Sequence, residues 1–268
     1  MGRKEQRNQR PGVTMSLSGG LGNQLSIYAT GRALAIHNSC PLYLDTSWFT
    51  RVGQRSLLLD QFDVEASFFP GRRSWLRNVE RSLSFAARSL HSFTRQPHSS
   101  YTYTSVTGET CFVRSDFQLD YGIFDLKPPF RVDAHVHYSY WRKHQLRIRS
   151  ELSSTVKARM NDLRRTLGLD GHSTWIALHA RQGDYMTPEN KRNLGVLTPD
   201  YYATALAEVQ KKVGRAPIVL FSDDPQGCLR WWRASGFDID VRLPPVGMSD
   251  LSQFFLMSSA PALVAANS

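Results

Sequence analysis

The first fifty residues alternate between short apolar runs and one longer helical pattern. The run "VTMSL" (Val13–Leu17) is bounded by Pro11-Gly12 and by a glycine cluster, so it predicts a buried strand. From Asn23 to about His37, apolar residues recur on one face at helical spacing, and "PLYLD" (Pro41–Asp45) predicts a second, parallel strand; the residues on that face are Leu25, Tyr28, Ala29, Ala33 and Ile36. Strand, glycine loop, helix and strand form a βαβ unit, which is typical of a Rossmann-like layered architecture.

The same alternation returns in the second half of the chain. Strands are predicted in "TWIALHA", "PIVLF", "DIDVRL" and "ALVAA", with helices at Pro199–Val213, Pro225–Ser235 and Ser249–Ser259 between them. We therefore expect an α/β protein with a disordered basic tail (1–11), a first Rossmann-like domain (12–165) and a second one (166–268).

The middle of the chain is less regular. Arg72 to Arg95 is arginine-rich with an apolar stripe, and two interpretations compete: a helix lying on an anionic membrane, or a surface helix packing on its own domain. We favour the second. The stretch "SSYTYTSVTGETCFVRSDFQ" has the composition of strands, and "LKPPF" then breaks the pattern.

Composition narrows the function classes. Lys and Arg total 33 against 23 Asp and Glu, which favours a partner that is nucleic acid, an anionic membrane surface or a phosphorylated substrate. The basic residues are scattered and lack the stacked aromatic motif of an RNA-binding module, so we expect no nucleic-acid partner. Three widely spaced cysteines indicate neither a disulfide framework nor a zinc site, and no signal peptide or membrane-spanning run is evident; we expect a cytoplasmic protein.

Three glycines fall within Gly19–Gly22, immediately before the first predicted helix. The cluster matches neither G-x-G-x-x-G nor a Walker loop. A plain tight turn and a nest of backbone N–H groups that binds an anion at a helix N-terminus both stay open.

Polar residues follow two predicted strands of the second half, in "HARQGDY" (His179–Tyr185) and "FSDD" (Phe221–Asp224). Ligands of open α/β sheets bind at the carboxyl ends of strands, where Arg181 could hold a phosphate through bidentate bonds. Asp223 and Asp224 could accept from a guanine edge or a ribose hydroxyl, or could cap the helix that follows. Asp238-Ile239-Asp240 spells D-x-D, but alternation places both carboxylates on one strand face, and we interpret them as solvated rather than as metal ligands.

Taken together and in order, "GGLGNQ", "YATGRALA", "HARQGDY", "FSDD" and "LMSSAPALVAANS" resemble the motifs of the bacterial α-1,2-fucosyltransferases. The resemblance implies two facing Rossmann-like halves in a B-type glycosyltransferase architecture. It also implies transfer of fucose from GDP-fucose to O2 of a galactose in a surface glycan, with inversion, without a metal or other cofactor, and in the cytoplasm or on the inner face of the membrane. The oligomeric state has no signal in the sequence.

The resemblance also implies roles for individual residues. Arg181 matches the family's diphosphate-binding arginine and would meet the charge that develops on the leaving GDP. Asp184 and Glu189, on the same loop, are candidates for the base that an inverting transfer needs. The implied donor-binding residues are Gly19, Gly20, Gly22, Asn23, Gln24, His179, Arg181, Ser222, Asp223, Asp224, Asn267 and Ser268.

Two departures from the family pattern matter. Gln182 stands where the family has a second arginine, and the sequence stops within the family's third motif. The expectation that follows is a second domain lacking its closing segment. The alternative to a transferase is a truncated or degenerate relative that binds a GDP-sugar without transferring it.

Overall fold

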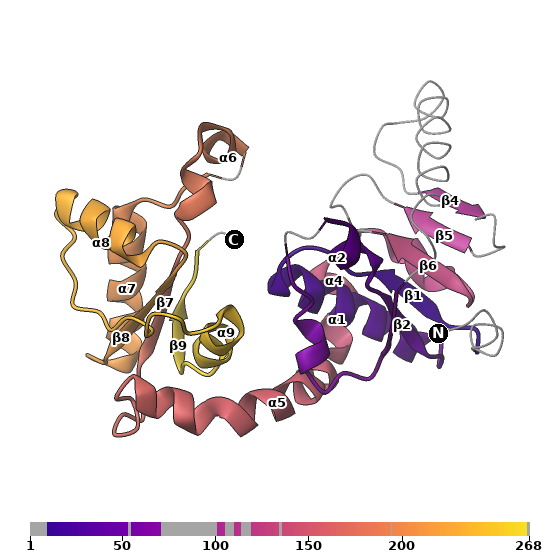
Figure 1. Cartoon of the computed structure of the whole chain (residues 1–268), viewed down its shortest axis with the longest axis horizontal. Helices are drawn as coiled ribbons and strands as arrows, with labels where there is room; N and C mark the ends of the chain where they lie inside the picture. Colours follow the sequence, from indigo (N-terminus) through magenta and orange to yellow (C-terminus); the bar gives the residue numbers. More distant parts are fainter. Residues whose placement is uncertain are drawn as a thin grey trace. The chain divides into compact units, whose positions relative to one another are not determined.

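A computed structural model describes residues 10–52, 55–70, 101–104, 110–113, 119–133, 136–193 and 195–266 (Figure 1). The helix predicted between Arg72 and Arg95, the first nine residues of the tail, Asn267 and Ser268 lie outside the described residues. Contacts divide the chain into two units, residues 1–155 and 156–268. The division falls inside helix α5 (Gln145–Thr166), and the domain boundary expected near residue 165 stays a prediction.

The first unit is built on a mostly parallel sheet. Its described strands are ordered β3-β2-β1-β6-β5-β4, and each neighbouring pair is parallel except β4 with β5, which is antiparallel. The parallel pairing of β1 with β2 confirms the predicted βαβ unit. The bounds are β1 (Val13–Ser16), β2 (Leu42–Asp45), β3 (Ser67–Phe69), β4 (Tyr101–Thr104), β5 (Thr110–Val113) and β6 (Phe130–Asp133).

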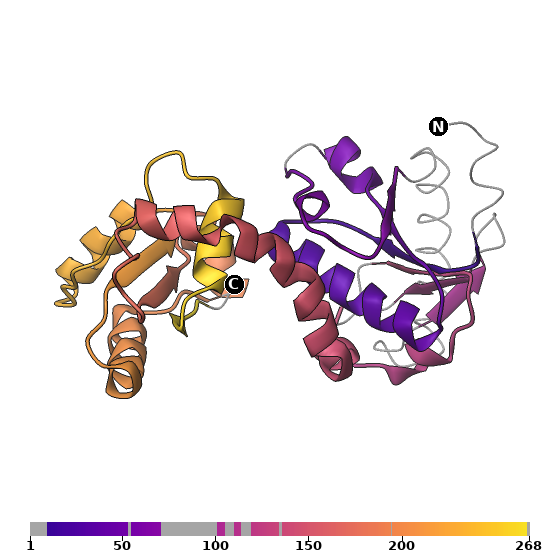
Figure 2. The same cartoon turned by 90° about the horizontal axis from the view of Figure 1, so that it is seen from below.

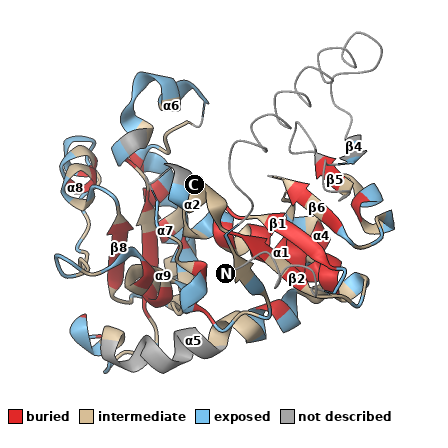
Figure 3. Ribbon diagram, turned by 45° about the vertical axis from the view of Figure 1, so that its right-hand side comes forward, coloured by how far each residue is buried: buried red, intermediate tan, exposed pale blue. Residues whose placement is uncertain are grey.

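Helix α1 (Leu21–His37) crosses from β1 to β2 and lies against the sheet, where Gly31 lets it approach Met15 and Leu42. The predicted helix is confirmed, and its burial extends beyond the predicted apolar face, because every residue from Ile27 to Ala35 is buried (Figure 3). The cause is packing by α4 (Tyr138–Trp141) and by the Glu151 side chain of α5, whose first half passes near α1 (Figure 2). The remaining helical segments here are α2 (Ser47–Val52), η2 (Leu59–Gln61), η3 (Tyr121–Asp125), α4 (Tyr138–Trp141) and η4 (Arg142–His144).

A buried polar cluster joins α5 to α1. Glu151 of α5 accepts a hydrogen bond of 2.6 Å from the hydroxyl of Tyr28 and bonds of 2.9–3.1 Å from the guanidinium of Arg32, which also pairs with Glu65. Burial, followed by the hydrogen bond to Glu151, raises the pKa of Tyr28 well above its usual range. Because its charged groups are paired and hydrogen-bonded, the cluster can be buried within the fold.

The second unit contains three parallel strands among its described residues, in the order β8-β7-β9: β7 (Ile176–Ala180), β8 (Ile218–Ser222) and β9 (Ala262–Val264). Trp232, Tyr202 and Leu178 lie in one of its hydrophobic clusters, and Trp175 with Phe221 lies in another. The helical segments are η5 (Gly183–Met186), α6 (Pro188–Asn193), α7 (Pro199–Val213), α8 (Pro225–Ala234) and α9 (Asp250–Ser258).

The strand predicted in "DIDVRL" is wrong as a full strand, since only Arg242 forms a bridge, to Val219 of β8. The alternation of polar and apolar residues over 238–241 still predicts which side chains are buried. Ile239 and Val241 pack on the core, while Asp238 and Asp240 are exposed, as predicted. Within the described ranges, no helix combines the length and the apolar character needed to cross a membrane.

Candidate functional site

Arg181 directly follows the carboxyl end of β7 and is held there by side chains of its own unit. Its Nε lies 3.3 Å from Oδ2 of Asp223, which follows β8, and its guanidinium lies 5.4 Å from the ring centre of Tyr185. The backbone of Arg181 also hydrogen-bonds the hydroxyl of buried Tyr202. The side chain stays 28% exposed, so the guanidinium is oriented but remains accessible to an anion.

Asp223 links the two motifs. Besides Arg181, its carboxylate accepts the backbone N–H of Gln182 at 2.9 Å. A Cβ added at Gly183 would collide with the same carboxylate, so the loop after β7 passes directly against Asp223. The "RQGDY" and "FSDD" stretches therefore pack against each other at the carboxyl ends of β7 and β8.

Asp224 has the capping role that was one of its two predicted alternatives. It is the N-cap of α8, and its Oδ1 accepts the N–H of Gly227 at 2.9 Å. The hydroxyl of Ser222 in turn accepts the N–H of Asp224 at 3.1 Å. Ser222 and Asp224 thus shape the turn that presents Asp223.

His179, the second-last residue of β7, adds no positive charge at neutral pH. Burial, followed by the nearby Arg181, lowers the pKa of its imidazole, and Asp223 opposes the shift only in part. The structure therefore brings together a neutral imidazole, a guanidinium and a carboxylate.

The remaining predicted residues of the loop are less constrained. Glu189 lies in the first turn of α6 and is exposed, and the side chain of Asp184 is outside the described residues. Gln182, which replaces the family's second arginine, is only 5% exposed, and in the described part of the chain its amide nitrogen has no hydrogen-bond partner.

The glycine loop of the first unit combines one glycine that the backbone requires with two that it does not. Gly19 has φ +76°, which disfavours other residues. Gly20, the N-cap of α1, has φ −74°, and a Cβ at Gly20 or Gly22 would meet no heavy atom within 4 Å. Within the described residues, packing gives no reason for glycine at these two positions.

Two predicted donor-binding residues beside the loop differ in character. Asn23 is exposed and lies against Gly19. Gln24 is fully buried, and its amide donates to the carbonyls of Gly19 and Ser56 and accepts the N–H groups of Leu58 and Leu59. Because its amide bonds four backbone groups, Gln24 holds the glycine loop in place, and its contact with the donor stays a prediction.

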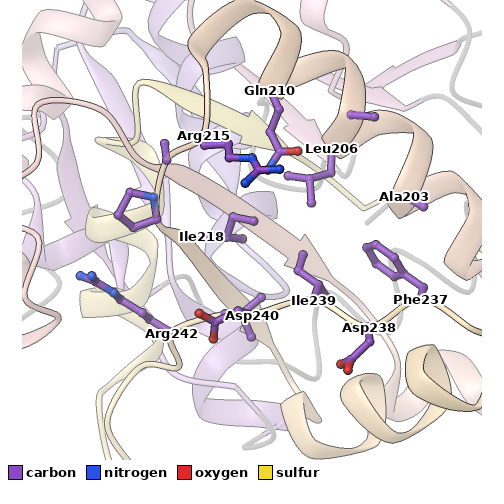
Figure 4. A pocket seen from close by; sticks show the side chains of 14 residues that line it. Ala203, Leu206, Gln210, Arg215, Ile218, Phe237, Asp238, Ile239, Asp240 and Arg242 are labelled. Carbon is purple, nitrogen blue, oxygen red and sulfur yellow. The ribbon is translucent and has the colours of Figure 1, made fainter.

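A pocket of about 770 Å³ in the second unit lies elsewhere (Figure 4). It is lined by α7, by the beginning of β8 at Ile218 and by residues 237–242, at the opposite end of β8 from Ser222. None of the predicted site residues lines it. In the described ranges, no group of three or more His, Cys, Asp or Glu side chains is arranged to hold a metal ion.

Comparison with known proteins agrees with the motif resemblance. Residues 124–241 match the family model of Glycosyl transferase family 11. The O-antigen biosynthesis glycosyltransferase WbnK of Escherichia coli is 33% identical over 97 residues, which are 34% of this chain and 30% of that relative. The chain therefore matches less than a third of the length of this relative.

Two solved structures are similar to this chain at 15% identity. The α-1,6-fucosyltransferase NodZ co-crystallised with GDP has a TM-score of 0.50, over 96% of this chain and 88% of that one. A structure of the fucosyltransferase NodZ from Bradyrhizobium has a TM-score of 0.46, over 93% and 84%. The family resemblance and the α/β fold class expected from the sequence are confirmed.

Proposed function

We propose, from the match of residues 124–241 to Glycosyl transferase family 11, that this chain transfers L-fucose from GDP-fucose to the 2-hydroxyl of a galactoside, with inversion. One observation carries the proposal. Arg181, inside the matched region, is held at the carboxyl ends of two parallel strands and is still open to an anion. This is where open α/β sheets bind their ligands.

The donor chemistry fits the groups at this place. Cleavage of the sugar–phosphate bond leaves negative charge on the diphosphate, and a preorganised cation stabilises that charge in the transition state. Asp223 and Tyr185 fix the guanidinium of Arg181 before the donor arrives, so no reorganisation is needed at the moment of reaction. In this proposal Arg181 supplies the positive charge without a metal.

The glycine loop of the first unit is by itself suited to bind an anion. The open space at Gly20 and Gly22 would admit the sugar nucleotide against the N-terminus of α1, where backbone N–H groups favour an anion. Gln24 keeps this loop in place. Asn267 and Ser268 complete the proposed donor contacts on the basis of the motif resemblance alone.

A second candidate function is binding of a GDP-sugar without transfer. The observation that favours it is Gln182, because a buried neutral amide cannot supply the charge of the family's second arginine. GDP binding alone does not separate the two candidates. Turnover does.

The test is a pair of measurements on the purified full chain. Calorimetric titration with GDP is expected to show saturable binding, and GDP-fucose with lactose as acceptor is expected to give a fucosylated product whose linkage NMR assigns to O2. GDP binding without turnover would favour the second candidate. No GDP binding would refute both.

A further inference from the structure

Three neighbouring strands of the first unit end in a row of polar residues. Ser16, Asp45 and Asp133 are the last residues of β1, β2 and β6. Ser16 pairs in register with Asp45, and the pairing of Met15 with Val132 places Asp133 beside Ser16 on the other side. Since side chains at one register level of a parallel sheet share a face, the three polar groups lie on one face.

This face is the one that α1 does not cover. Helix α1 packs against Met15, and side chains alternate along a strand, so Ser16 points to the opposite face. Arg131 precedes Asp133 by two residues and therefore shares its face. The register of the strands alone therefore places the guanidinium of Arg131 on the same face as the row of polar residues Ser16, Asp45 and Asp133.

The hydrogen bonds within this cluster have a defined direction. Nη1 of Arg131 donates to Oδ2 of Asp45 at 2.9 Å and to the hydroxyl oxygen of Ser16 at 3.1 Å. The hydroxyl of Ser16 donates to Oδ1 of Asp133. Because the oxygen of Ser16 already accepts from Arg131, its single hydrogen is directed to Asp133.

The two carboxylates, Asp45 and Asp133, differ in their exposure and in their remaining capacity to accept a hydrogen bond. Asp45 is 1% exposed, with Oδ2 taken by Arg131 and Oδ1 by the N–H of Ser47. Asp133 is partly exposed, and among the described residues its Oδ2 takes no hydrogen bond. Asp133 is the carboxylate that is both oriented and accessible.

The location is the switch point of the sheet. The chain leaves β1 through α1 to β2 on one side, whereas β6 lies on the other side of β1. Ligands of open α/β sheets bind outside the carboxyl ends of the strands at such a point. Only Leu17 and Ser18 separate Ser16 from Gly19, so the glycine loop begins at this same end of the sheet.

We propose that Asp133 is the base that takes the proton from the acceptor hydroxyl, with Ser16, Arg131 and Asp45 as positioning residues. The inference rests on the proposed function. The hydroxyl O–H bond breaks and its proton goes to Oδ2 of Asp133. The hydroxyl oxygen forms the bond to C1 of fucose, while the bond from C1 to the phosphate oxygen breaks and its electron pair leaves with GDP.

This assignment competes with Asp184 and Glu189, which the motif resemblance suggested, and the side chain of Asp184 lies outside the described residues. Glu189 is exposed in the first turn of a six-residue helix, and no described side chain orients its carboxylate. Asp133 is held by a hydroxyl whose own direction is fixed by a guanidinium. A base must be positioned before its pKa matters, and by this criterion Asp133 is the better candidate.

The test is Asp133→Asn in the full chain, assayed with GDP-fucose and lactose. The amide oxygen can still accept the hydrogen of Ser16, so the variant keeps the local hydrogen bond and loses only the ability to accept a proton. We expect kcat to fall about 10²–10⁴-fold. The KM for lactose, the Kd for GDP and the thermal midpoint should be unchanged, and the acidic limb of the kcat/KM profile should be lost.

Two matched variants accompany it. Asp125→Asn makes the same change at an exposed carboxylate of η3 and should leave turnover unchanged. Glu189→Gln tests the competing base and should retain most of the activity. Asp133→Ser, whose hydroxyl can also accept from Ser16, replaces Asp133→Asn if the latter does not fold.

The outcomes separate this inference from the function on which it rests. A wild-type chain that transfers fucose while Asp133→Asn transfers it equally well overturns the inference alone. Loss of turnover in Glu189→Gln with normal turnover in Asp133→Asn assigns the base to Glu189. A wild-type chain that neither binds GDP nor transfers fucose refutes the proposed function, and this inference with it.

Discussion

Replacing Arg181 with alanine separates binding from folding, because its side chain is held by contacts that contribute little to stability. The Arg181–Asp223 pair spans 3.3 Å, with 28% and 25% of the two side chains exposed. Asp223 keeps the N–H of Gln182 when the guanidinium is removed. A partly solvated ion pair of this kind contributes about 1 kcal/mol or less, so the thermal midpoint without ligand should fall by no more than about 4 °C.

The effect on GDP binding should be much larger. Truncating one partner of a hydrogen-bonded charge pair costs about 2–5 kcal/mol, which corresponds to a roughly 30- to 4,000-fold rise in the Kd for GDP. Arg181→Lys keeps the charge but loses the planar, bidentate geometry, so its Kd should lie between those of the wild type and the alanine variant.

Isothermal titration of each variant with GDP measures the Kd, and a thermal melt of the same sample measures stability. Arg233→Ala is the matched control. Arg233 belongs to the same unit and pairs with Asp238 at 3.1 Å, but it lies in the last turn of α8 and is 63% exposed. Its Kd should equal that of the wild type. If Arg181→Ala binds GDP as tightly as the wild type, Arg181 is not at the diphosphate and the proposed donor site is wrong.

Three further predictions concern the first unit. Glu151→Gln removes one of the two carboxylates that pair with buried Arg32, which keeps Glu65, and should lower the free energy of unfolding by about 1–3 kcal/mol in urea titrations. Exposed Glu208→Gln should cause no change, and a Glu151→Gln midpoint equal to that of the wild type would contradict this. The pKa of Tyr28 is raised in the folded protein, so its contribution to stability should be constant below about pH 10, where the unfolded phenol titrates, and should fall above it. Burial also raises the pKa of Tyr202 and of Cys228, so Tyr28→Phe should make the alkaline slope shallower without removing it, and an unchanged slope would reject the assignment. Gly20→Val should leave circular dichroism and melting unchanged, since its Cβ meets no neighbour, but should weaken GDP-fucose binding; a folded variant with wild-type affinity would show that no ligand occupies the space.

The second unit could be predicted closely because its signals are local. Proline stands at the first turn of both α7 and α8, and the predicted starts at Pro199 and Pro225 are confirmed. The strands β7 and β8 are apolar and buried over Ile176–Leu178 and Ile218–Phe221, as expected of strands buried on both faces. Where burial was one-sided, at 238–243, the alternation predicted exposure correctly but not the pairing, because only Arg242 bonds to β8.

The first unit could be predicted only in part. Strand β6, "FRVD", has four residues and two charged side chains, which is too short for a period-two pattern to stand out. Its pairing with β1, which lies more than a hundred residues earlier in the chain, depends on the tertiary structure and cannot be predicted from a local sequence pattern. Arg131 and Asp133 were therefore missed, although an aspartate at the end of an apolar alternation is a signal that could have directed attention to them.

The motifs predicted locations better than they predicted roles. The motif "GGLGNQ" correctly placed a glycine loop before a helix, yet Gln24 turned out to be saturated by backbone groups up to 35 residues away. A buried amide satisfies its donors and acceptors wherever the fold supplies partners, and those partners are not visible in the adjacent sequence.

The close approach of Gly183 to Asp223 has a consequence for how this protein can change. A side chain at position 183 would push the carboxylate of Asp223 off the Arg181 guanidinium, so a substitution there acts at a distance on the group proposed to bind phosphate. A smaller residue at 223 would make room for a Cβ at 183, but would leave the guanidinium without its brace. The effect of a substitution at position 183 should therefore depend on the residue at position 223, forty residues away, and the reverse.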